Sequence, residues 1–344
     1  MDFLVIGAGV SGLAVADQLL RRGGSVSVLD RGAVGQESSW AGGGILSPLC
    51  PWDYSAAVNQ LALRGMALFP AFASELHQAT GIDPEYQTSG LLVLPPFDRT
   101  RAESWCADHQ LAVERIPASR VLPHLSADAL LLPGIGQVRN PRLIQALRRR
   151  VELGGGKIIE HCAVTEIAVQ NGRVRGVHSS QGEWQAGQYI VTTGAWTRNL
   201  LAATAAAPDI RPVRGQMLLY RFDTPPLRHI VLQDGLYLIP RRDGHLLVGS
   251  TLEEVGFDKS TTATALHELS QHAARLLPAL RDRMPVRHWA GLRPGSPDNL
   301  PHIGRHATLG NLWLNAGHFR YGVTMAPASA EKLMNCLLTG QDQP

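Results

Sequence analysis

The first 30 residues carry the pattern that most restricts what this chain can fold into. Phe3–Ile6 is a short apolar run, typical of a buried parallel strand, and the glycine loop Gly7–Gly12 (GAGVSG) follows it directly. Val10–Arg22 then has the apolar spacing of a helix, and Ser25–Leu29 has the character of a second strand that ends at Asp30. A strand, a GxGxxG loop, a helix, a strand and an acid in this order predict a βαβ unit that binds a dinucleotide. A tight structural turn in some other α/β protein is the alternative.

Each part of the glycine loop has a physical role in such a unit. Gly7 allows the tight turn, Gly9 lets a pyrophosphate approach the backbone, and Gly12 lets the helix pack against the strand. Free N–H groups at the helix N-terminus attract the phosphates. Asp30 can accept hydrogen bonds from ribose hydroxyls, and its negative charge would repel a 2′-phosphate. The loop therefore argues against NADP but does not decide between FAD and NAD.

Composition narrows the class of protein. A chain of 344 residues with 44% hydrophobic and 18% charged residues is long enough for about two globular domains. A formal charge of +3 with no basic block argues against nucleic-acid binding. The four cysteines have no zinc-site spacing, so we expect no metal site and reduced, mostly buried thiols. No apolar run has the length of a membrane span or the form of a signal peptide, so we predict a cytoplasmic protein without membrane contact.

Two further segments favour FAD over NAD. Residues 37–46 include three consecutive glycines, Gly42–Gly44, which allow a flat ring to lie against the backbone. Ser38 and Ser39 could bond ribityl or phosphate oxygens. Residues 311–338 predict a strand, a loop and a helix whose N-terminus points at the ligand. Its partial positive charge could stabilise a reduced isoalloxazine, a contact that an NAD enzyme does not need.

With both ends of the chain described, the sequence resembles the D-amino-acid oxidase superfamily of FAD-dependent oxidoreductases, and within it the glycine oxidases of thiamine biosynthesis. The resemblance runs nearly end to end, and the order of its motifs is specific. These motifs are the glycine loop with Asp30, Ser38-Ser39 with Gly43–Leu46, Gly194–Trp196, Tyr237–Arg241, Trp289–Gly295 and Gly317–Gly322.

The resemblance implies a two-domain α/β (α+β) fold: a Rossmann-type FAD-binding domain and a substrate domain with a mostly antiparallel sheet. Short alternating runs between Pro212 and Arg293 agree, because they predict antiparallel strands. We expect the FAD-binding domain to be discontinuous, over residues 1–80, 134–210 and 300–344. The substrate domain is expected over residues 81–133 and 211–299.

Local signals predict elements in the middle of the chain. Residues 54–80 have the pattern of one long helix, bent near Pro70. Asn140 followed by Pro141 predicts a helix start with Asn140 as the N-cap. Asn171-Gly172 predicts a hairpin turn.

The resemblance also implies an activity. It implies non-covalent FAD, because the chain has no cysteine between Cys162 and Cys336, where sarcosine oxidases of this superfamily carry their flavin-linking cysteine. The implied reaction is oxidative deamination of glycine and small amines (sarcosine, D-alanine) by hydride transfer from the α-carbon to flavin N5. The products would be an imine or glyoxylate, ammonia and H2O2, with O2 as the electron acceptor. A homotetramer is expected, and thiazole synthase is a candidate partner.

The residues are also compatible with other functions. One is a related D-amino-acid or secondary-amine dehydrogenase that passes electrons to a quinone. Another is a non-catalytic FAD-binding protein, whose flavin no amine would bleach. An NAD-dependent enzyme is a more distant alternative.

A substrate with a carboxylate needs a cation, and arginine fits best because its planar fork bonds both oxygens. The resemblance places Arg293 on the carboxylate-binding arginine, the Tyr237 hydroxyl beside it, and Arg320 near flavin and substrate. The residues alone leave an alternative for each: Arg293 could pair with a structural carboxylate, and Tyr237 could be a core residue. We predict Tyr237, Arg293 and Arg320 as catalytic residues, and the same three with Leu252 as substrate-binding residues; Leu252 and Trp40 are candidates for apolar walls.

His318 is a candidate general base. A hydride mechanism requires no base at the α-carbon, so a contact to the flavin or to the backbone is the favoured interpretation. The predicted cofactor-binding residues are Gly7, Gly9, Val10, Ser11, Gly12, Asp30, Arg31, Ser38, Ser39, Gly43, Gly44, Ile45, Val164, Gly194, Trp196, Gly317, His318, Phe319, Arg320, Tyr321, Gly322, Val323 and Thr324.

Overall fold

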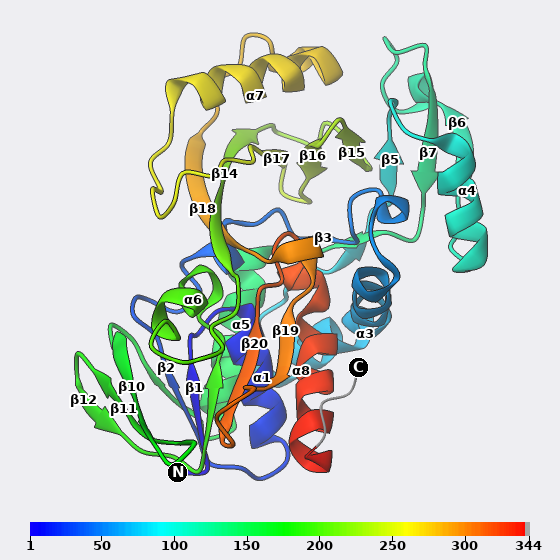
Figure 1. Cartoon of the computed structure of the whole chain (residues 1–344). Helices are drawn as coiled ribbons and strands as arrows, with labels where there is room; N and C mark the ends of the chain where they lie inside the picture. The colour runs from blue at the N-terminus through cyan, green and yellow to red at the C-terminus, as the bar shows by residue number, and fades with distance from the viewer. Residues whose placement is uncertain (341–344) are drawn as a thin grey trace.

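A computed structural model describes residues 1–340 and contains a mostly parallel sheet whose strands come from both ends and the middle of the chain (Figure 1). Its six strands lie in the order β19-β20-β13-β1-β2-β9, and every neighbouring pair is parallel except β19 with β20. The central strands are almost wholly buried, because helices cover one face of the sheet and a three-stranded sheet formed by residues 164–184 covers the other. The strands are β1 Phe3–Ile6, β2 Val26–Leu29, β9 Lys157–Ile159, β13 Gln188–Val191, β19 His302–Arg305 and β20 Leu312–Ala316.

Helices from both ends of the chain pack together beside this sheet. The C-terminal helix α8 lies against both α1 and α3, so the last segment returns to the glycine loop (Figure 1). Gly65 permits the contact between α3 and α8, because a Cβ there would stand 2.0 Å from the carbonyl oxygen of Thr324. The helices are α1 Val10–Leu20, α2 Ser38–Ala41, α3 Ala56–Thr80, α4 Arg99–Asp108, α5 Asn140–Leu153, α6 Thr197–Leu200, α7 Ala263–Leu276 and α8 Gly322–Thr339.

The structure corrects two local predictions. Asn140 is the first residue of α5 and Arg139 is its N-cap; the Asn140 amide instead donates to the carbonyl oxygen of Ser39 at 2.8 Å. A tertiary hydrogen bond has thus replaced the local one. Helix α3 begins at Ala56, where the Ser55 hydroxyl caps it.

The second large sheet has eight strands and is mostly antiparallel (Figure 1). Their order is β18-β14-β17-β16-β15-β5-β7-β6, and only β15 and β5 pair in parallel. Helix α7 covers one face, where its apolar side chains join a buried cluster with β14, β16 and β17. The strands are β5 Leu91–Val93, β6 Glu114–Pro117, β7 Asp128–Leu132, β14 Arg211–Arg221, β15 Ile230–Gln233, β16 Leu236–Pro240, β17 His245–Gly249 and β18 Arg287–Gly295.

Two three-stranded sheets make up the other sheets within residues 1–340. One contains the predicted hairpin with its turn at Asn171-Gly172 and consists of β10 Val164–Gln170, β11 Arg173–Ser179 and β12 Gly182–Trp184. The other joins β3 Ile45–Leu46, β8 Gly136–Gln137 and β4 Gln87–Thr88.

The arrangement of the sheets confirms the predicted fold class. The strands of the parallel sheet come from residues 3–29, 157–191 and 302–316, and those of the antiparallel sheet come from residues 91–132 and 211–295. The division into two domains at the expected boundaries stays a prediction. Residues 341–344 of the expected FAD-binding domain lie outside the described residues. Between residues 1 and 340, no helix has both the length and the apolarity needed to cross a membrane.

Candidate active site

A cavity of about 410 Å³ opens at the carboxyl ends of the parallel strands. Each of these strands places a residue at its end in the cavity wall. Ile6 ends β1 and Gly7 follows it, Asp30 follows β2, Thr192 follows β13, and Ala316 ends β20. Open α/β sheets bind ligands at this edge. The cavity also reaches β16 and β18, so residues of both large sheets form its wall.

The glycine loop needs its glycines for reasons of space. Gly7 has a φ of +110°, and a Cβ there would stand 2.6 Å from the carbonyl oxygen of Thr192. A Cβ on Gly12 would meet the carbonyl oxygen of Gly7 at 1.9 Å, so Gly12 is the contact between α1 and β1. A Cβ on Gly9 would have only one near neighbour, the Ser39 hydroxyl at 3.1 Å, so Gly9 faces the cavity.

Asp30 is tied to the glycine loop by its side chain. Its Oδ2 accepts from the backbone N–H of Ala8 at 2.7 Å, and its Oδ1 accepts from Gly32 N–H at 2.9 Å. Burial raises the pKa of Asp30, although these two hydrogen bonds act in the opposite direction. Each carboxylate oxygen keeps a second lone pair that a ribose hydroxyl could use.

The triple-glycine stretch is held from behind by a buried arginine. Arg241 is 4% exposed and donates to the carbonyl oxygens of Gly43 and Val138 at 2.7 and 2.8 Å, and to Gln137 Oε1 at 2.6 Å. Burial lowers the pKa of Arg241 to about 10, so it remains a cation at neutral pH. Before the stretch begins, the hydroxyl of Ser39 accepts from the N–H of Val10 at 2.9 Å. These bonds hold the stretch at Gly43 and at Ser39, which precedes it.

Aromatic side chains stack near another part of the cavity wall. The guanidinium of Arg31 lies 3.8 Å from the ring centre of Trp196, and both residues line the cavity. Phe257 packs on Trp196 with ring centres 5.4 Å apart. Val164, at the start of β10, and Gly194, with a φ of +53°, line the wall as well.

The C-terminal loop, residues 317–321, lines the cavity just before α8 begins at Gly322. Phe319 N–H donates to the carbonyl oxygen of Pro294 at 3.0 Å, which joins this loop to β18. His318 is 3% exposed, and burial lowers its pKa to about 4, so its ring is neutral at pH 7. Thr324, in the first turn of α8, donates to the carbonyl oxygen of Ile45 at 3.1 Å.

Two arginines and a tyrosine meet at the far end of the cavity. Arg293 donates to the Ser250 hydroxyl and to the carbonyl oxygens of Thr251 and Arg214. These acceptors are neutral, and within residues 1–340 neither Arg293 nor Arg320 forms an ion pair. Burial lowers the pKa of Arg293; the adjacent Tyr237 opposes this shift and the charge of Arg320 adds to it. Two guanidinium groups without carboxylate partners would favour an anion at this end of the cavity.

The structure brings together nearly all of the predicted site residues. Every predicted cofactor-binding residue except Gly12 lines the cavity, and so do Tyr237, Arg293 and Arg320. Leu252 does not line it: its side chain is 56% exposed. Thr251 and Glu253 turn toward β14, and along an extended chain the residue between them must face the other way. Trp40 is also absent from the lining and packs edge-on against Trp289.

Sequence reasoning missed several residues of the wall. Asn140, Asn315 and Ser250 line the cavity, and Gly215 lies behind Arg293. Only Asn140 gave a local signal, and that signal suggested a helix cap. The other three have no motif that marks them, because their roles depend on segments distant in sequence.

The chain belongs to a family of FAD-dependent oxidoreductases. The model of the family described as "DAO: FAD dependent oxidoreductase" matches residues 2–335. The chain is 44% identical to the glycine oxidase of Pseudomonas putida, over 98% of this chain and 94% of that protein. It is 33% identical to the bifunctional protein ThiO/ThiG of Synechocystis, over all of this chain and 52% of that protein. The crystal structure of glycine oxidase from Geobacillus kaustophilus superposes with a TM-score of 0.93 at 28% identity, covering 99% of this chain and 95% of that one.

The cavity wall fits the FAD that this family uses. Buried polar atoms normally have hydrogen-bond partners, yet Asn140 Oδ1, both amide atoms of Asn315 and His318 Nε2 have none among the described residues. A polar ligand would satisfy them. Gly9 and the N-terminus of α1 suit a pyrophosphate, Asp30 suits a ribose, and Gly42–Gly44 opposite α8 suit a flat ring.

Proposed function

We propose that this protein oxidises glycine and related small amines such as sarcosine and D-alanine. The overall conversion takes glycine, O2 and water to glyoxylate, ammonia and H2O2. Similarity to glycine oxidases over nearly the whole length of the chain supports this assignment.

The observation that carries the proposal is the guanidinium of Arg293 at the far end of the cavity. Among residues 1–340, its hydrogen-bond acceptors are all neutral, and Arg320 adds a second positive charge nearby. Desolvation of the half-buried Arg293 guanidinium lowers its pKa, and an anionic ligand would offset the cost of that charge. A small amino acid presents such an anion in its carboxylate, and arginine can bond both carboxylate oxygens.

The chain's own residues then orient the substrate. Arg293 and Tyr237 hold the carboxylate, which leaves the α-carbon and its amine directed into the cavity. Bound FAD supplies the acceptor for the hydride that leaves the α-carbon. His318 is neutral at pH 7, so it adds no third positive charge and holds no proton to donate from an imidazolium. Orientation in a partly closed cavity accounts for most of the rate enhancement that we expect.

An anaerobic absorbance titration of the purified protein tests the substrate. Glycine, sarcosine, D-alanine and D-proline are added separately, and bleaching of the flavin absorbance is recorded. We expect glycine to bleach the flavin and peroxide to form when air is admitted. Bleaching without peroxide would point to a quinone as acceptor, and a flavin that no amine bleaches would contradict an amine-oxidising role.

The variant Arg293→Ala tests the carboxylate site. The apparent KM for glycine should rise by an amount equivalent to about 2–5 kcal/mol, because a charge-assisted pair is lost, while FAD stays bound. Arg287→Ala is the control, since Arg287 lies exposed on the same strand and its guanidinium stacks on Trp40. An unchanged KM in Arg293→Ala would remove this arginine from the site.

We further propose a cytoplasmic homotetramer that works beside thiazole synthase. The ThiO/ThiG relative, of which this chain matches about half, supports an association with a second enzyme. Light scattering after gel filtration tests the oligomeric state. Co-purification with thiazole synthase tests the association, and separate elution at all concentrations would argue against a stable complex.

A further inference from the structure

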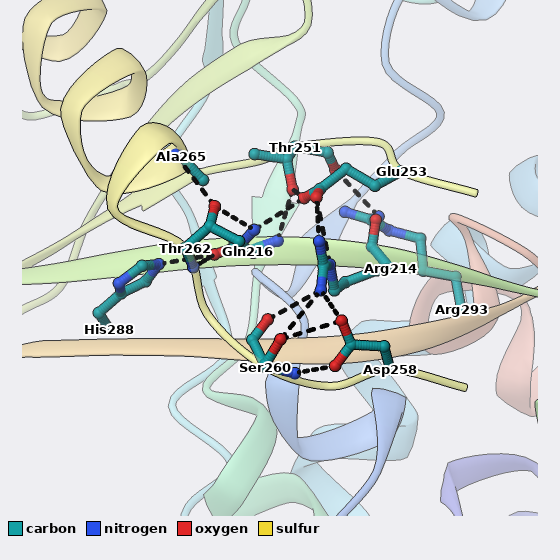
Figure 2. Close-up of polar contacts among 10 residues, drawn as sticks. All are labelled: Arg214, Gln216, Thr251, Glu253, Asp258, Ser260, Thr262, Ala265, His288 and Arg293. Atoms are coloured by element: carbon teal, nitrogen blue, oxygen red, sulfur yellow. Dashed lines mark hydrogen bonds and ion pairs between the residues drawn. The ribbon is translucent and has the colours of Figure 1, made fainter. Parts of the chain in front are cut away.

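The loop between β17 and α7, residues 250–262, holds the guanidinium of Arg293 (Figure 2). Arg293 Nη1 donates to the carbonyl oxygens of Thr251 and Arg214 at 3.2 and 3.4 Å, and Nη2 donates to the Ser250 hydroxyl at 2.5 Å. Two of these three acceptors belong to the β17–α7 loop. The direction of the guanidinium therefore depends on where this loop lies.

An ion pair fastens the β17–α7 loop to β14. Arg214 is 4% exposed, and its guanidinium donates to the carboxylates of Glu253 and Asp258, to the latter at 2.7 Å (Figure 2). The backbones of Arg214 and Glu253 also pair in both directions, at 2.9 and 3.0 Å. Arg214 thus binds the loop through its backbone and its side chain, and its carbonyl oxygen accepts from Arg293.

The other carboxylate oxygen of Glu253 fixes Thr251. Oε1 accepts from the Thr251 hydroxyl and from Gln216 Nε2, the latter at 2.9 Å. The Thr251 hydroxyl in turn accepts from the N–H of Gln216 at 2.9 Å. Gln216 is fully buried and is further held by Thr262 and His288 (Figure 2). Thr251, whose carbonyl oxygen accepts from Arg293, is therefore held in place by the hydrogen bonds of its side chain.

Glu253 is a charged member of this network. Burial on its own would raise the pKa of Glu253, but hydrogen bonds from Arg214, Thr251 and Gln216 outweigh it and the pKa lies below its usual value. The carboxylate is therefore ionised at neutral pH, and both of its oxygens accept hydrogen bonds. It does not line the cavity, so any effect on the substrate passes through its neighbours.

We propose that Glu253 is a positioning residue for the substrate carboxylate: through Thr251 and Arg214, it sets the direction of the Arg293 guanidinium. This inference rests on the proposed function. Without the Glu253 charge, the Thr251 carbonyl and the loop can shift, and the guanidinium shifts with them. Carboxylate binding weakens, while the steps after binding change less.

The test compares Glu253→Gln with two matched variants in FAD-loaded protein. Glu254→Gln removes a carboxylate from the next, exposed residue of the loop, and Asp258→Asn removes the half-exposed second partner of Arg214. The measurements are the Kd of acetate from its perturbation of the flavin absorbance, the KM and kcat for glycine, the retention of FAD and the urea midpoint of unfolding. In Glu253→Gln, the acetate Kd and the glycine KM should rise by about 10- to 100-fold, as expected for a displacement near 1 Å, with a smaller change in kcat. Asp258→Asn should raise the acetate Kd and the glycine KM less, and Glu254→Gln should leave both unchanged.

An acetate Kd in Glu253→Gln equal to that of the wild type, with FAD bound, overturns the proposal. Equal increases of the acetate Kd in Glu253→Gln and Asp258→Asn also overturn the proposal. Glu253 would then do no more than balance the charge of Arg214. If Glu253→Gln does not fold, Thr251→Val keeps the ion pair and removes the hydroxyl, and it should give the same split between KM and kcat to a smaller degree. A wild-type protein that responds to neither acetate nor glycine would contradict the proposed function instead.

Discussion

The guanidinium of Arg293 lies directly against the Cα of Gly215, on the neighbouring strand β14. A Cβ at Gly215 would stand 2.1 Å from Nη1 and 2.4 Å from Cζ of Arg293. Strands β14 and β18 are paired in register here, with Val213 opposite Arg293 and Gly215 opposite Gly291. The arginine therefore lies over its partner strand because that strand has no side chain at this position.

Gly215→Ala should displace Arg293 without straining the backbone, since Gly215 has no left-handed φ. A shift of about 1 Å predicts a glycine KM raised by up to about 100-fold. FAD should remain bound. Gly134→Ala is the control, because Gly134 is exposed and a Cβ there meets nothing within 4 Å. A glycine KM unchanged by Gly215→Ala would mean that Arg293 can bind the carboxylate from another position.

Gly9→Val should abolish FAD binding. The space at Gly9 is open to the cavity apart from the Ser39 hydroxyl, so a valine side chain would fill the place that a pyrophosphate needs. The purified variant should be colourless, and its fluorescence titration with FAD should show no saturable binding. Yellow protein carrying one FAD per chain would exclude this position for the phosphates.

Burial of a neutral His318 should make stability depend on pH in a defined window. The folded-state pKa is about 4 and the reference value is 6.5. Between these values the unfolded chain binds a proton at this residue and the folded chain does not. The free energy of unfolding should therefore fall by up to about 3 kcal/mol as pH drops from 6.5 to 4. Above pH 6.5 the protein should keep all of this contribution to its stability.

Urea unfolding of wild type and His318→Gln, at matched FAD saturation, measures that contribution. The difference between the two curves of stability against pH should lie in this window. His267→Gln, an exposed position on α7, serves as the reference substitution. Parallel curves for wild type and His318→Gln would show that His318 can be charged in the folded protein.

Replacement of Arg241 should be among the most destabilising single changes. Arg241→Gln leaves the acceptors of Gly43, Val138 and Gln137 short of a donor in the interior. Each buried unsatisfied group costs about 1–3 kcal/mol, so the free energy of unfolding should fall by about 3 kcal/mol or more. Arg242→Gln, at the exposed neighbouring residue, should cost under about 1 kcal/mol. Similar urea midpoints for the two variants would contradict this account.

Sequence alone determined the parts of the protein whose interactions are local. The strand, glycine loop, helix and acid of the first 30 residues lie so close along the chain that their order fixes their geometry. The hairpin at Asn171-Gly172 is also local, since the turn residues choose the register. For the same reason, nearly all of the cofactor-binding residues predicted from short motifs line the cavity.

Tertiary structure decided which side chains from distant segments meet around the cavity. Arg214 and Glu253 are 39 residues apart and Arg241 and Gly43 are 198 apart, and no periodicity links such pairs. Leu252 was expected at the pocket, but the pairing of Glu253 with β14 turns it to solvent. Asn140 has the form of a helix cap and bonds to Ser39 instead. A side chain's direction depends on which distant segment packs against it, and only the assembled sheets supply that segment.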